Sequence, residues 1–296
     1  MSDKLQEIEE IFEKYLEAGK ILSKVRSQAV DRVKVGGNVL EIAEFVEQKT
    51  IELGAKPAFP CNISANDEAA HATPRKDDES VFGKDMIKLD MGVHIDGYIA
   101  DSAVTVDFTG NSDLVKASED ALYAGIDCIK DGINTAEIAG AIEDAITAYG
   151  LKPVANLTGH GLAPYITHAP PSIPNRRINQ GITLHSGDVI AIEPFATDGA
   201  GRVADGSWSE IYSLIEKKPV RLPAARKILK EIESYRTLPF ARRWLKSDRL
   251  EFALTQLTRN NIIRSYPVLK EIEGGLVSQA EHTVIVTDDG CEIITK

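Results

Sequence analysis

Cysteine is scarce in this chain of 296 residues, which contains Cys61, Cys128 and Cys291 and no other. The count is odd and no two cysteines form a C-x-x-C pair. The sequence therefore argues against a disulfide framework and against a zinc site built from thiolates. Such sparse cysteine fits a reducing compartment, and we expect a cytoplasmic protein.

Long apolar runs are missing as well. No run is long enough to span a bilayer, and the N-terminus lacks the apolar region of a signal peptide. Positive charge is in deficit, because 34 Lys and Arg face 45 Asp and Glu and leave a net charge of -11. We therefore expect neither a membrane protein nor a DNA-binding protein. Carboxylates that cluster in such a chain repel one another unless cations hold them.

Apolar residues make up 43% of the chain, enough for one large core, and we expect a single domain over residues 1–296. Helical and strand periodicity predict the following order. Helices are predicted over 5–33 and 39–53, followed by short apolar runs that end in a strand pair over 86–107. Helices are then predicted over 114–129 and 135–149, and strands over 189–195 and 279–286. Two helices followed by strands, twice over, predict an internally duplicated α+β domain.

The segment 217–264 differs in composition from the rest. It carries thirteen Lys and Arg against four Asp and Glu. Its pattern predicts short helices over 224–235, 239–245 and 248–259. Such a segment is either a solvated helical face with ordinary basic residues or a surface that binds phosphate.

A hairpin with two aspartates is predicted between residues 86 and 107. Asp96-Gly97 is a strong two-residue turn. With that loop, Asp101 lies opposite Gly92, two residues from Asp90, so both carboxylates leave the same face about 7–8 Å apart. Two carboxylates aimed at one point are costly without a cation. The alternative is a pair of exposed aspartates on an acidic protein.

Two glutamates stand in apolar strand patterns, Glu193 in 189–195 and Glu281 in 279–286. Glutamate is rarely buried unless it is paired or bound to a metal. Three histidines sit in distinctive settings: His160 between two glycines, His168 eight residues later, and His71 in the segment that follows Phe59. For the other three we expect structural roles, and these are His94, His185 and His282.

Four carboxylates and one neutral imidazole form a coherent ligand set. Their four negative charges balance two divalent cations, and hard oxygen ligands with one imidazole suit Mn²⁺, Fe²⁺, Co²⁺ or Zn²⁺. Paired metal ions of this kind occur in aminopeptidases, among other hydrolases.

The residues that carry these features resemble a known family. The stretches LDMGVHIDGYIADSAVTV, TGHG, THAPPSIPN, AIEPFAT and SQAEHTVIV are similar to those of methionine aminopeptidase, type 2. The resemblance covers essentially the whole chain. It implies the pita-bread fold, a pseudo-twofold α+β domain with a central curved antiparallel sheet. It also implies a helical, winged-helix-like insert before the last ligand strand, here residues 207–265.

The resemblance further implies a dinuclear metal site. In it, Asp101 and Glu281 would bridge two divalent ions, Asp90 would complete one site, and His160 and Glu193 would complete the other. A hydroxide held between the ions would attack the carbonyl of an N-terminal methionine, and Glu193 would carry the proton to the leaving amine.

The family's substrate-binding positions fall on five residues of this chain: Phe59, His71, His168, Phe195 and Tyr266. His168 would stabilise the oxyanion and His71 would hydrogen-bond the scissile amide. The aromatic residues would wall the slot for the methionine side chain. Thr167 departs from the family, where a bulkier aliphatic residue is usual. The implied substrates are methionyl peptides and nascent proteins with a small second residue.

Three other hypotheses accompany this one. The first is a Xaa-Pro dipeptidase or aminopeptidase P, which resembles this family in fold and ligand set but usually carries a further N-terminal domain. A non-catalytic binding protein of the pita-bread fold would lack several ligands. The basic segment would, in addition, contact ribosomal RNA through Lys and Arg. We expect a monomer.

Overall fold

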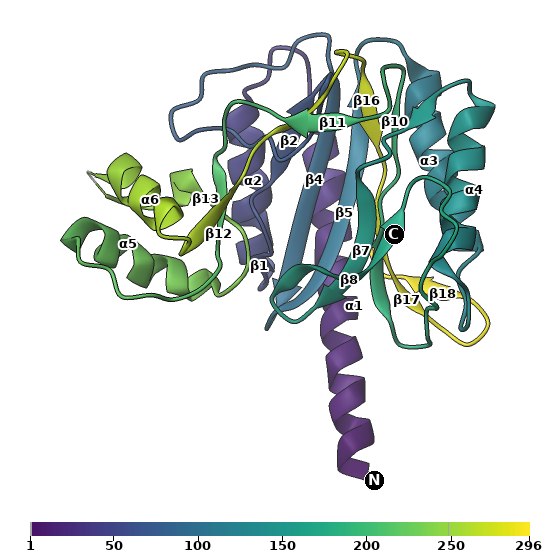
Figure 1. Ribbon diagram of the computed structural model, residues 1–296, viewed down its shortest axis with the longest axis horizontal. Coiled ribbons are helices and arrows are strands. Elements are labelled where there is room, and N and C mark those ends of the chain that lie inside the picture. The colour runs from purple at the N-terminus through teal and green to yellow at the C-terminus, as the bar shows by residue number, and fades with distance from the viewer. Residues whose placement is uncertain (1, 248) are drawn as a thin grey trace.

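The computed structural model describes residues 2–247 and 249–296 (Figure 1). The helices are α1 (Ser2–Val30), α2 (Val39–Glu52), α3 (Ser112–Asp127), α4 (Thr135–Ala148), α5 (Pro223–Ile232) and α6 (Leu250–Arg259), with 3-10 turns η1 (Glu233–Tyr235) and η2 (Arg242–Trp244). The strands of the first half are β1 (Lys56–Pro57), β2 (Asn62–Ala65), β3 (Glu68–Ala70), β4 (Met86–Ile95) and β5 (Tyr98–Asp107).

The later strands are β6 (Lys152–Pro153), β7 (Thr158–Ala163), β8 (Ile166–Pro174), β9 (Val189–Ile192), β10 (Phe195–Thr197), β11 (Val203–Asp205), β12 (Ile211–Leu214), β13 (Phe240–Ala241), β14 (Ile263–Tyr266), β15 (Leu269–Glu271), β16 (Val277–Gln279), β17 (His282–Val286) and β18 (Cys291–Ile293). The expected order of two helices followed by strands, repeated once, is therefore confirmed.

Local signals explain several helix ends. The Asn38 side chain accepts from the Glu41 N–H at 3.0 Å at the start of α2, and the Asn134 side chain caps α4. Gly54 follows the end of α2 with a positive φ of 93°, a conformation that favours glycine. The first helix runs over Ser2–Val30, so the prediction of 5–33 placed both of its ends too late.

The two helix pairs pack around two hydrophobic clusters, and strand residues of the second half such as Ala191 and Ile285 reach into the first. Helices α1 and α2 pack against the β4–β5 hairpin around a core that includes Leu22, Val46 and Leu89. Helices α3 and α4 pack against the sheet of order β18-β17-β9-β7-β8, around a core that includes Leu122 and Ile142. Figure 1 shows the strands of both halves between these two helix pairs. The duplicated arrangement leaves the strand surfaces of the two halves facing a common centre.

Two predicted strands are interrupted in the structure. The predicted strand 189–195 ends as β9 at Ile192 and resumes as β10 at Phe195, and 279–286 breaks in the same way between β16 and β17. β9 pairs with β17, whereas β10 pairs with β16. Both strands therefore switch sheets at the same level, and each break contains a glutamate. The prediction of continuous strands was wrong because an apolar run does not reveal which sheet each half joins.

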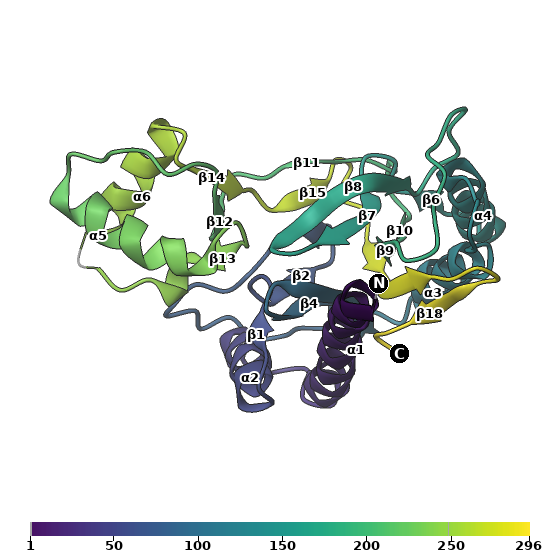
Figure 2. The same ribbon diagram turned by 90° about the horizontal axis from the view of Figure 1, so that it is seen from below.

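Residues 207–265, called the helical insert below, have a core of their own. Ile228, Leu257 and Phe240 belong to it, and β12 is the central strand of a small sheet with β13 and β14. Figure 2 shows α5 and α6 at the end of the molecule opposite α3 and α4.

The predicted helix 239–245 is wrong. Phe240–Ala241 forms β13 against Ile211–Tyr212, and a single 3-10 turn follows. The pairing partner lies about thirty residues earlier in the chain, so local periodicity could not reveal it. The helix predicted over 248–259 is α6, and its first position, residue 248, lies outside the described residues.

Within the described ranges, no helix combines the length and the apolar character that a membrane crossing requires.

Candidate metal centre

The β4–β5 hairpin places two carboxylates on one face. Its turn has positive φ at both Asp96 (51°) and Gly97 (96°), as a two-residue turn of this type requires. The register pairs Gly92 with Asp101 and places Asp90 two residues away on the same face, as predicted. The opposite face is apolar and packs into the first core. The turn chemistry therefore fixes where both carboxylates point.

The two glutamates lie at the breaks between strand pairs. Glu193 follows β9 and Glu281 precedes β17. The Ala280 N–H donates to the Pro194 carbonyl at 3.3 Å, and the Glu281 N–H donates to the Ala103 carbonyl of the hairpin at 3.0 Å. These bonds hold the second glutamate beside the hairpin aspartates. Pro194 has no N–H to donate, which suits the position where the strand leaves one sheet for another.

Glycines allow His160 to approach the same point. A Cβ atom on Gly159 would lie 2.3 Å from the Ala191 carbonyl oxygen, and one on Gly161 would lie 2.2 Å from the Pro170 carbonyl oxygen. Only glycine permits the neighbouring strands to come this close. His160 Nε2 lies 3.3 Å from Glu193 Oε1.

The residues at this point fit divalent cations. Ligand atoms of Asp101, His160 and Glu281 all lie within 4.8 Å of one another. The buried Oδ1 atoms of Asp90 and Asp101 have no hydrogen-bond partner among the described residues. A buried carboxylate oxygen without a donor is costly, and a cation would offset that cost. His160 and Glu193 add one imidazole and one further carboxylate beside them.

The electrostatics point the same way. Burial, together with the neighbouring Glu193, raises the pKa of Asp90 to about 7. Burial, reinforced by the other carboxylates, also raises the pKa of Asp101 and of Glu281 well above their usual range. Without cations, these groups repel one another and hold protons that free carboxyls would release.

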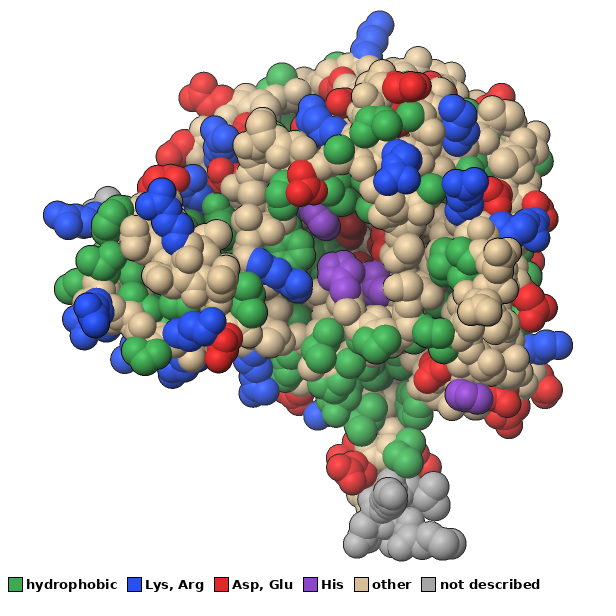
Figure 3. Space-filling view, viewed as in Figure 1, with side chains coloured by type: hydrophobic (Ala, Val, Ile, Leu, Met, Phe, Trp, Pro, Cys, Tyr) green, Lys and Arg blue, Asp and Glu red, His purple; other side chains and the backbone are tan. Residues whose placement is uncertain are grey.

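A cavity of about 220 Å³ opens over this cluster. Figure 3 shows a hollow on this face with histidine side chains at its rim and acidic atoms inside. Every one of the ten predicted site residues lines the cavity, and these are Phe59, His71, Asp90, Asp101, His160, His168, Glu193, Phe195, Tyr266 and Glu281. The geometry brings them together, while their individual roles stay predictions.

Two histidines stand beside the carboxylates at the wall. The His168 ring lies 4.6 Å from the His160 ring, centroid to centroid, and the His71 ring lies 5.5 Å from that of Tyr266. Loss of hydration lowers the pKa of both, and His160 lowers that of His168 further. Both rings are therefore neutral at physiological pH. His71 Nδ1 donates its N–H to the Pro267 carbonyl at 3.2 Å, which leaves its other nitrogen as an acceptor, whereas His168 can donate one N–H. Thr167 Oγ1 lies 3.2 Å from His168 Nδ1, so the hydroxyl can fix the tautomer.

Sequence reasoning missed two amides of the site. Asn62 lies opposite Asp90 on the neighbouring strand β2 and lines the cavity. The Gln279 Nε2 atom donates to Asp90 Oδ2 at 3.5 Å. The only signal available was that each is a polar residue in an apolar strand pattern. That signal indicates burial but not a partner.

The histidines assigned structural roles lie elsewhere. His94 Nδ1 accepts from the Gly97 N–H at 3.0 Å and so braces the hairpin turn. His282 Nδ1 lies 2.8 Å from Thr295 Oγ1. His185 is exposed beside Asp131, at 3.5 Å. These contacts agree with the expectation.

Comparison with known proteins adds independent information. The model of metallopeptidase family M24 matches residues 13–288. A methionine aminopeptidase of Archaeoglobus fulgidus is 56% identical over 290 residues, which are 97% of this chain and 99% of the relative. A methionine aminopeptidase of Methanocaldococcus jannaschii is 52% identical over 291 residues, covering 96% and 98% of the two chains.

Solved structures share the fold. A thermophilic Arx1 superposes with a TM-score of 0.85 at 19% identity, covering 96% of this chain and 90% of that one. Methionine aminopeptidase of Thermotoga maritima superposes with a TM-score of 0.71 at 23% identity and covers 96% of both chains. The expected pita-bread fold is thereby confirmed.

Proposed function

Because this chain belongs to metallopeptidase family M24, we propose that the cavity over Asp101, His160 and Glu281 is its active site. The chain is a metal-dependent aminopeptidase that removes N-terminal methionine, the activity for which its close archaeal relatives are named. One observation above all supports this location. Four carboxylates and an imidazole from distant parts of the chain meet at the floor of one cavity.

We propose that two divalent ions, of cobalt, manganese, iron or zinc, are held by these five residues. Asp101 and Glu281 would be shared between the ions, Asp90 would bind one, and His160 and Glu193 would bind the other. The orphaned Oδ1 atoms of Asp90 and Asp101 support this assignment. Bound ions of this kind supply Lewis-acid activation of water and of the methionyl carbonyl.

The chain's own residues do the rest. Glu193 accepts a proton from the attacking water and passes it to the leaving amine. The neutral His168 ring donates its N–H to the developing oxyanion, with Thr167 holding the tautomer. His71 accepts from the N–H of the scissile amide, because its own Nδ1–H donates to the Pro267 carbonyl. Phe59, Phe195 and Tyr266 pack against the methionine side chain, and the small cavity favours substrates with a small second residue.

A direct assay tests this function. Purified protein supplied with Mn²⁺ or Co²⁺ is expected to hydrolyse Met-Ala-Ser to methionine and Ala-Ser, and elemental analysis to find about two metal ions per chain. A Xaa-Pro peptide serves as the competing substrate. Faster cleavage of the Xaa-Pro peptide would indicate a prolidase-type enzyme instead, and inactivity on both with metal bound would indicate a binding protein.

The helical insert supports a second proposal, contact with the ribosome. We propose that residues 207–265 form a subdomain whose exposed basic side chains touch ribosomal RNA while a nascent chain reaches the cavity. Many of them face solvent, namely Lys217, Arg221, Arg226, Lys227, Lys230, Arg236, Lys246, Arg249, Arg259 and Arg264. Binding through phosphates weakens steeply with salt. Co-sedimentation with ribosomes at low salt that disappears at raised salt is the expected result, and its absence at low salt would exclude the contact.

Processing of nascent chains also implies where and how the protein works. We propose that it is cytoplasmic and acts as a monomer. The free thiols of Cys61, Cys128 and Cys291 are compatible with a reducing compartment.

A further inference from the structure

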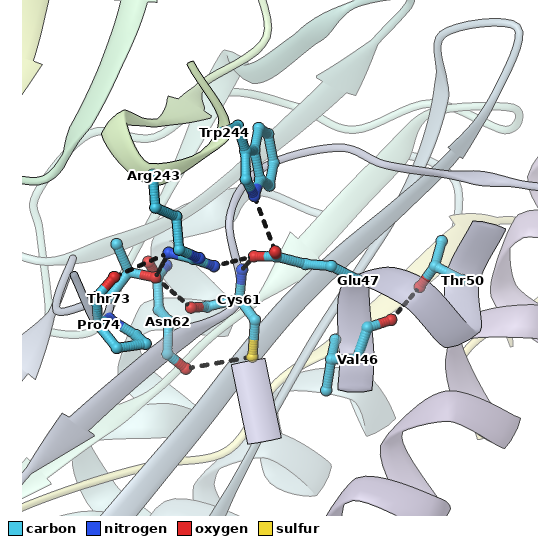
Figure 4. Close-up of polar contacts among 9 residues, drawn as sticks. All are labelled: Val46, Glu47, Thr50, Cys61, Asn62, Thr73, Pro74, Arg243 and Trp244. Carbon is cyan, nitrogen blue, oxygen red and sulfur yellow. Dashed lines mark hydrogen bonds and ion pairs between the residues drawn. The ribbon is translucent and has the colours of Figure 1, made fainter. Parts of the chain in front are cut away.

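A buried ion pair joins the helical insert to the first half of the protein. Arg243, in η2 of the insert, pairs with Glu47 of α2, and the two side chains are only 4% and 10% exposed. The adjacent Trp244 Nε1 donates to the other carboxylate oxygen, Glu47 Oε2, at 2.8 Å. Figure 4 shows the three side chains converging from the two parts of the chain.

The same two side chains also form hydrogen bonds with both ends of the segment between residues 61 and 74. Glu47 Oε1 accepts from the Cys61 N–H at 3.2 Å. Arg243 Nη1 donates to Thr73 Oγ1 at 2.7 Å and to the Pro74 carbonyl at 3.1 Å. The Thr73 hydroxyl in turn donates to the Cys61 carbonyl at 2.7 Å. The Glu47 carboxylate therefore binds the first end of this segment, and the Arg243 guanidinium binds the second.

That segment and the insert form much of the cavity wall. Asn62 and His71 lie between the two fastened ends, and Phe59 comes two residues before Cys61. His71 has a positive φ of 66°, an uncommon conformation for a residue with a side chain, so the surrounding structure must hold it there. From the other side, the insert contributes Ile211 and Pro239 to the same wall, and Tyr266 follows directly after its last residue.

We infer that Glu47 and Arg243 are positioning residues which, as a latch between α2 and the insert, set the shape of the methionine pocket. Within the described residues, the cavity lining includes neither of them, so they act through the wall and not on the substrate. The inference rests on the proposed function, since it assigns the pocket to methionine.

Burial makes this latch difficult to replace. Removing one member of a buried ion pair leaves the other charge without compensation. The wall residues would contact the methionine side chain equally in the ground state and in the transition state. Loosening them should therefore raise KM, and any shift of His71 away from the scissile amide should lower kcat as well.

The test compares Glu47→Gln, Arg243→Met and Arg243→Lys with Arg242→Met. Arg242 is the matched control, because it neighbours Arg243 but is partly exposed and pairs with the exposed Glu251 and with the buried Glu210, which Arg75 also pairs with. With Met-Ala-Ser as substrate, Glu47→Gln and Arg243→Met should raise KM about tenfold or more. Arg243→Lys should fall between them and the wild type, because lysine lacks the planar fork. The metal content of all four variants should stay unchanged, and so should the KM of Arg242→Met.

Free methionine provides a readout that does not depend on turnover. Its dissociation constant, measured by calorimetry, should rise in parallel with KM in the same variants. A lower melting temperature with unchanged KM and unchanged methionine affinity would overturn the latch and leave a purely structural ion pair. If Arg243→Met does not fold, Glu47→Gln decides, because its amide oxygen still accepts from Trp244 or Cys61. If the wild type binds methionine but cleaves no methionyl peptide, the proposed function fails, and the methionine affinities alone judge the latch.

Discussion

Asp101 and His168 line the same cavity, yet their removal should have different consequences. Asp101→Asn replaces a carboxylate at the centre of the proposed ligand set by a weaker neutral ligand. Metal content and peptidase activity should be lost together while the fold is kept. His168→Ala removes a hydrogen-bond donor outside the ligand set, so metal should remain while kcat falls about 10²–10³-fold.

Elemental analysis and steady-state kinetics on the same preparations check both outcomes, with circular dichroism as the control for folding. Equal loss of metal in the two variants would contradict the separate roles. It would mean that His168 supports the ligand cluster itself.

His94 provides a test of pH dependence away from the metal ligands. Burial, together with the nearby Lys56, lowers its pKa from an ordinary 6.5 to about 4. The folded state therefore resists protonation that the unfolded state accepts. The contribution of His94 to stability is complete above about pH 6.5 and is lost as the pH falls toward 4.

His94→Gln should accordingly flatten the fall in stability over this range. Urea denaturation at pH 4.5, 5.5 and 7 measures it, and the difference between variant and wild type cancels the other titrating groups. A difference in unfolding free energy that is the same at all three pH values would show that His94 contributes only packing.

At the scale of elements, the β4–β5 turn should be sensitive to a single methyl group. A Cβ atom on Gly97 would lie 2.3 Å from the Tyr165 ring, at a φ of +96°. Gly97→Ala should therefore cost both the left-handed backbone conformation and the packing of Tyr165. We expect a loss of about 1–3 kcal/mol or more in thermal or denaturant unfolding.

Gly110 is the matched control for this substitution. Its φ is +87°, and among the described residues, its two chain neighbours aside, no atom lies within 4 Å of where a Cβ atom would stand. Gly110→Ala isolates the backbone cost, about 1 kcal/mol. If the two variants lose the same stability, the contact between the turn and Tyr165 contributes nothing.

The elements differ in how well the sequence predicts them, for physical reasons. The hairpin register followed correctly from Asp96-Gly97, because a two-residue turn fixes every pair after it. The breaks beside Glu193 and Glu281 were missed, because each continuous apolar run contains two halves that pair in different sheets. Short elements such as β13 depend on partners remote in sequence and leave little local pattern.

The site shows the same division. The same-face placement of Asp90 and Asp101 could be worked out from spacing alone. The convergence of the ten predicted residues in one cavity could not be worked out in this way, because they come from seven or more separate segments. Only the family resemblance indicated that they share one site. Asn62 and Gln279 escaped notice because their role depends on contact with Asp90, which no local pattern records.

At the scale of the whole molecule, the metal ions would join the two halves. Asp90 and Asp101 come from the hairpin of the first half, whereas His160, Glu193 and Glu281 come from strands of the second. Each half packs its helices around an apolar cluster, second-half residues such as Ala191 and Ile285 also pack into the first cluster, and carboxylates of both halves meet at the cavity floor. Ions that neutralise this floor should therefore stabilise the whole fold, by about 2.7 kcal/mol at a free concentration of 100 times Kd.

Removal of the metal by a chelator should then reverse the pH dependence contributed by the cavity floor. In the metal-free protein, the raised pKa values of Asp90, Asp101 and Glu281 mean that the folded state holds protons which the unfolded state has released. The contribution of Asp90 is complete below about pH 4 and is lost as the pH rises through about 7, and Asp101 and Glu281 shift the stability in the same direction. The metal-loaded protein should not share this loss, because binding ions requires the carboxylates to be ionised.

Thermal unfolding of chelated and Mn²⁺-loaded protein between pH 5 and 8 measures the effect. The two melting temperatures should diverge as the pH rises, with the chelated protein falling behind. Since every group outside the site is common to both samples, the divergence isolates the cavity floor. Parallel curves would mean that the carboxylates do not share a site with the ions, and the metal centre would have to lie elsewhere in the chain.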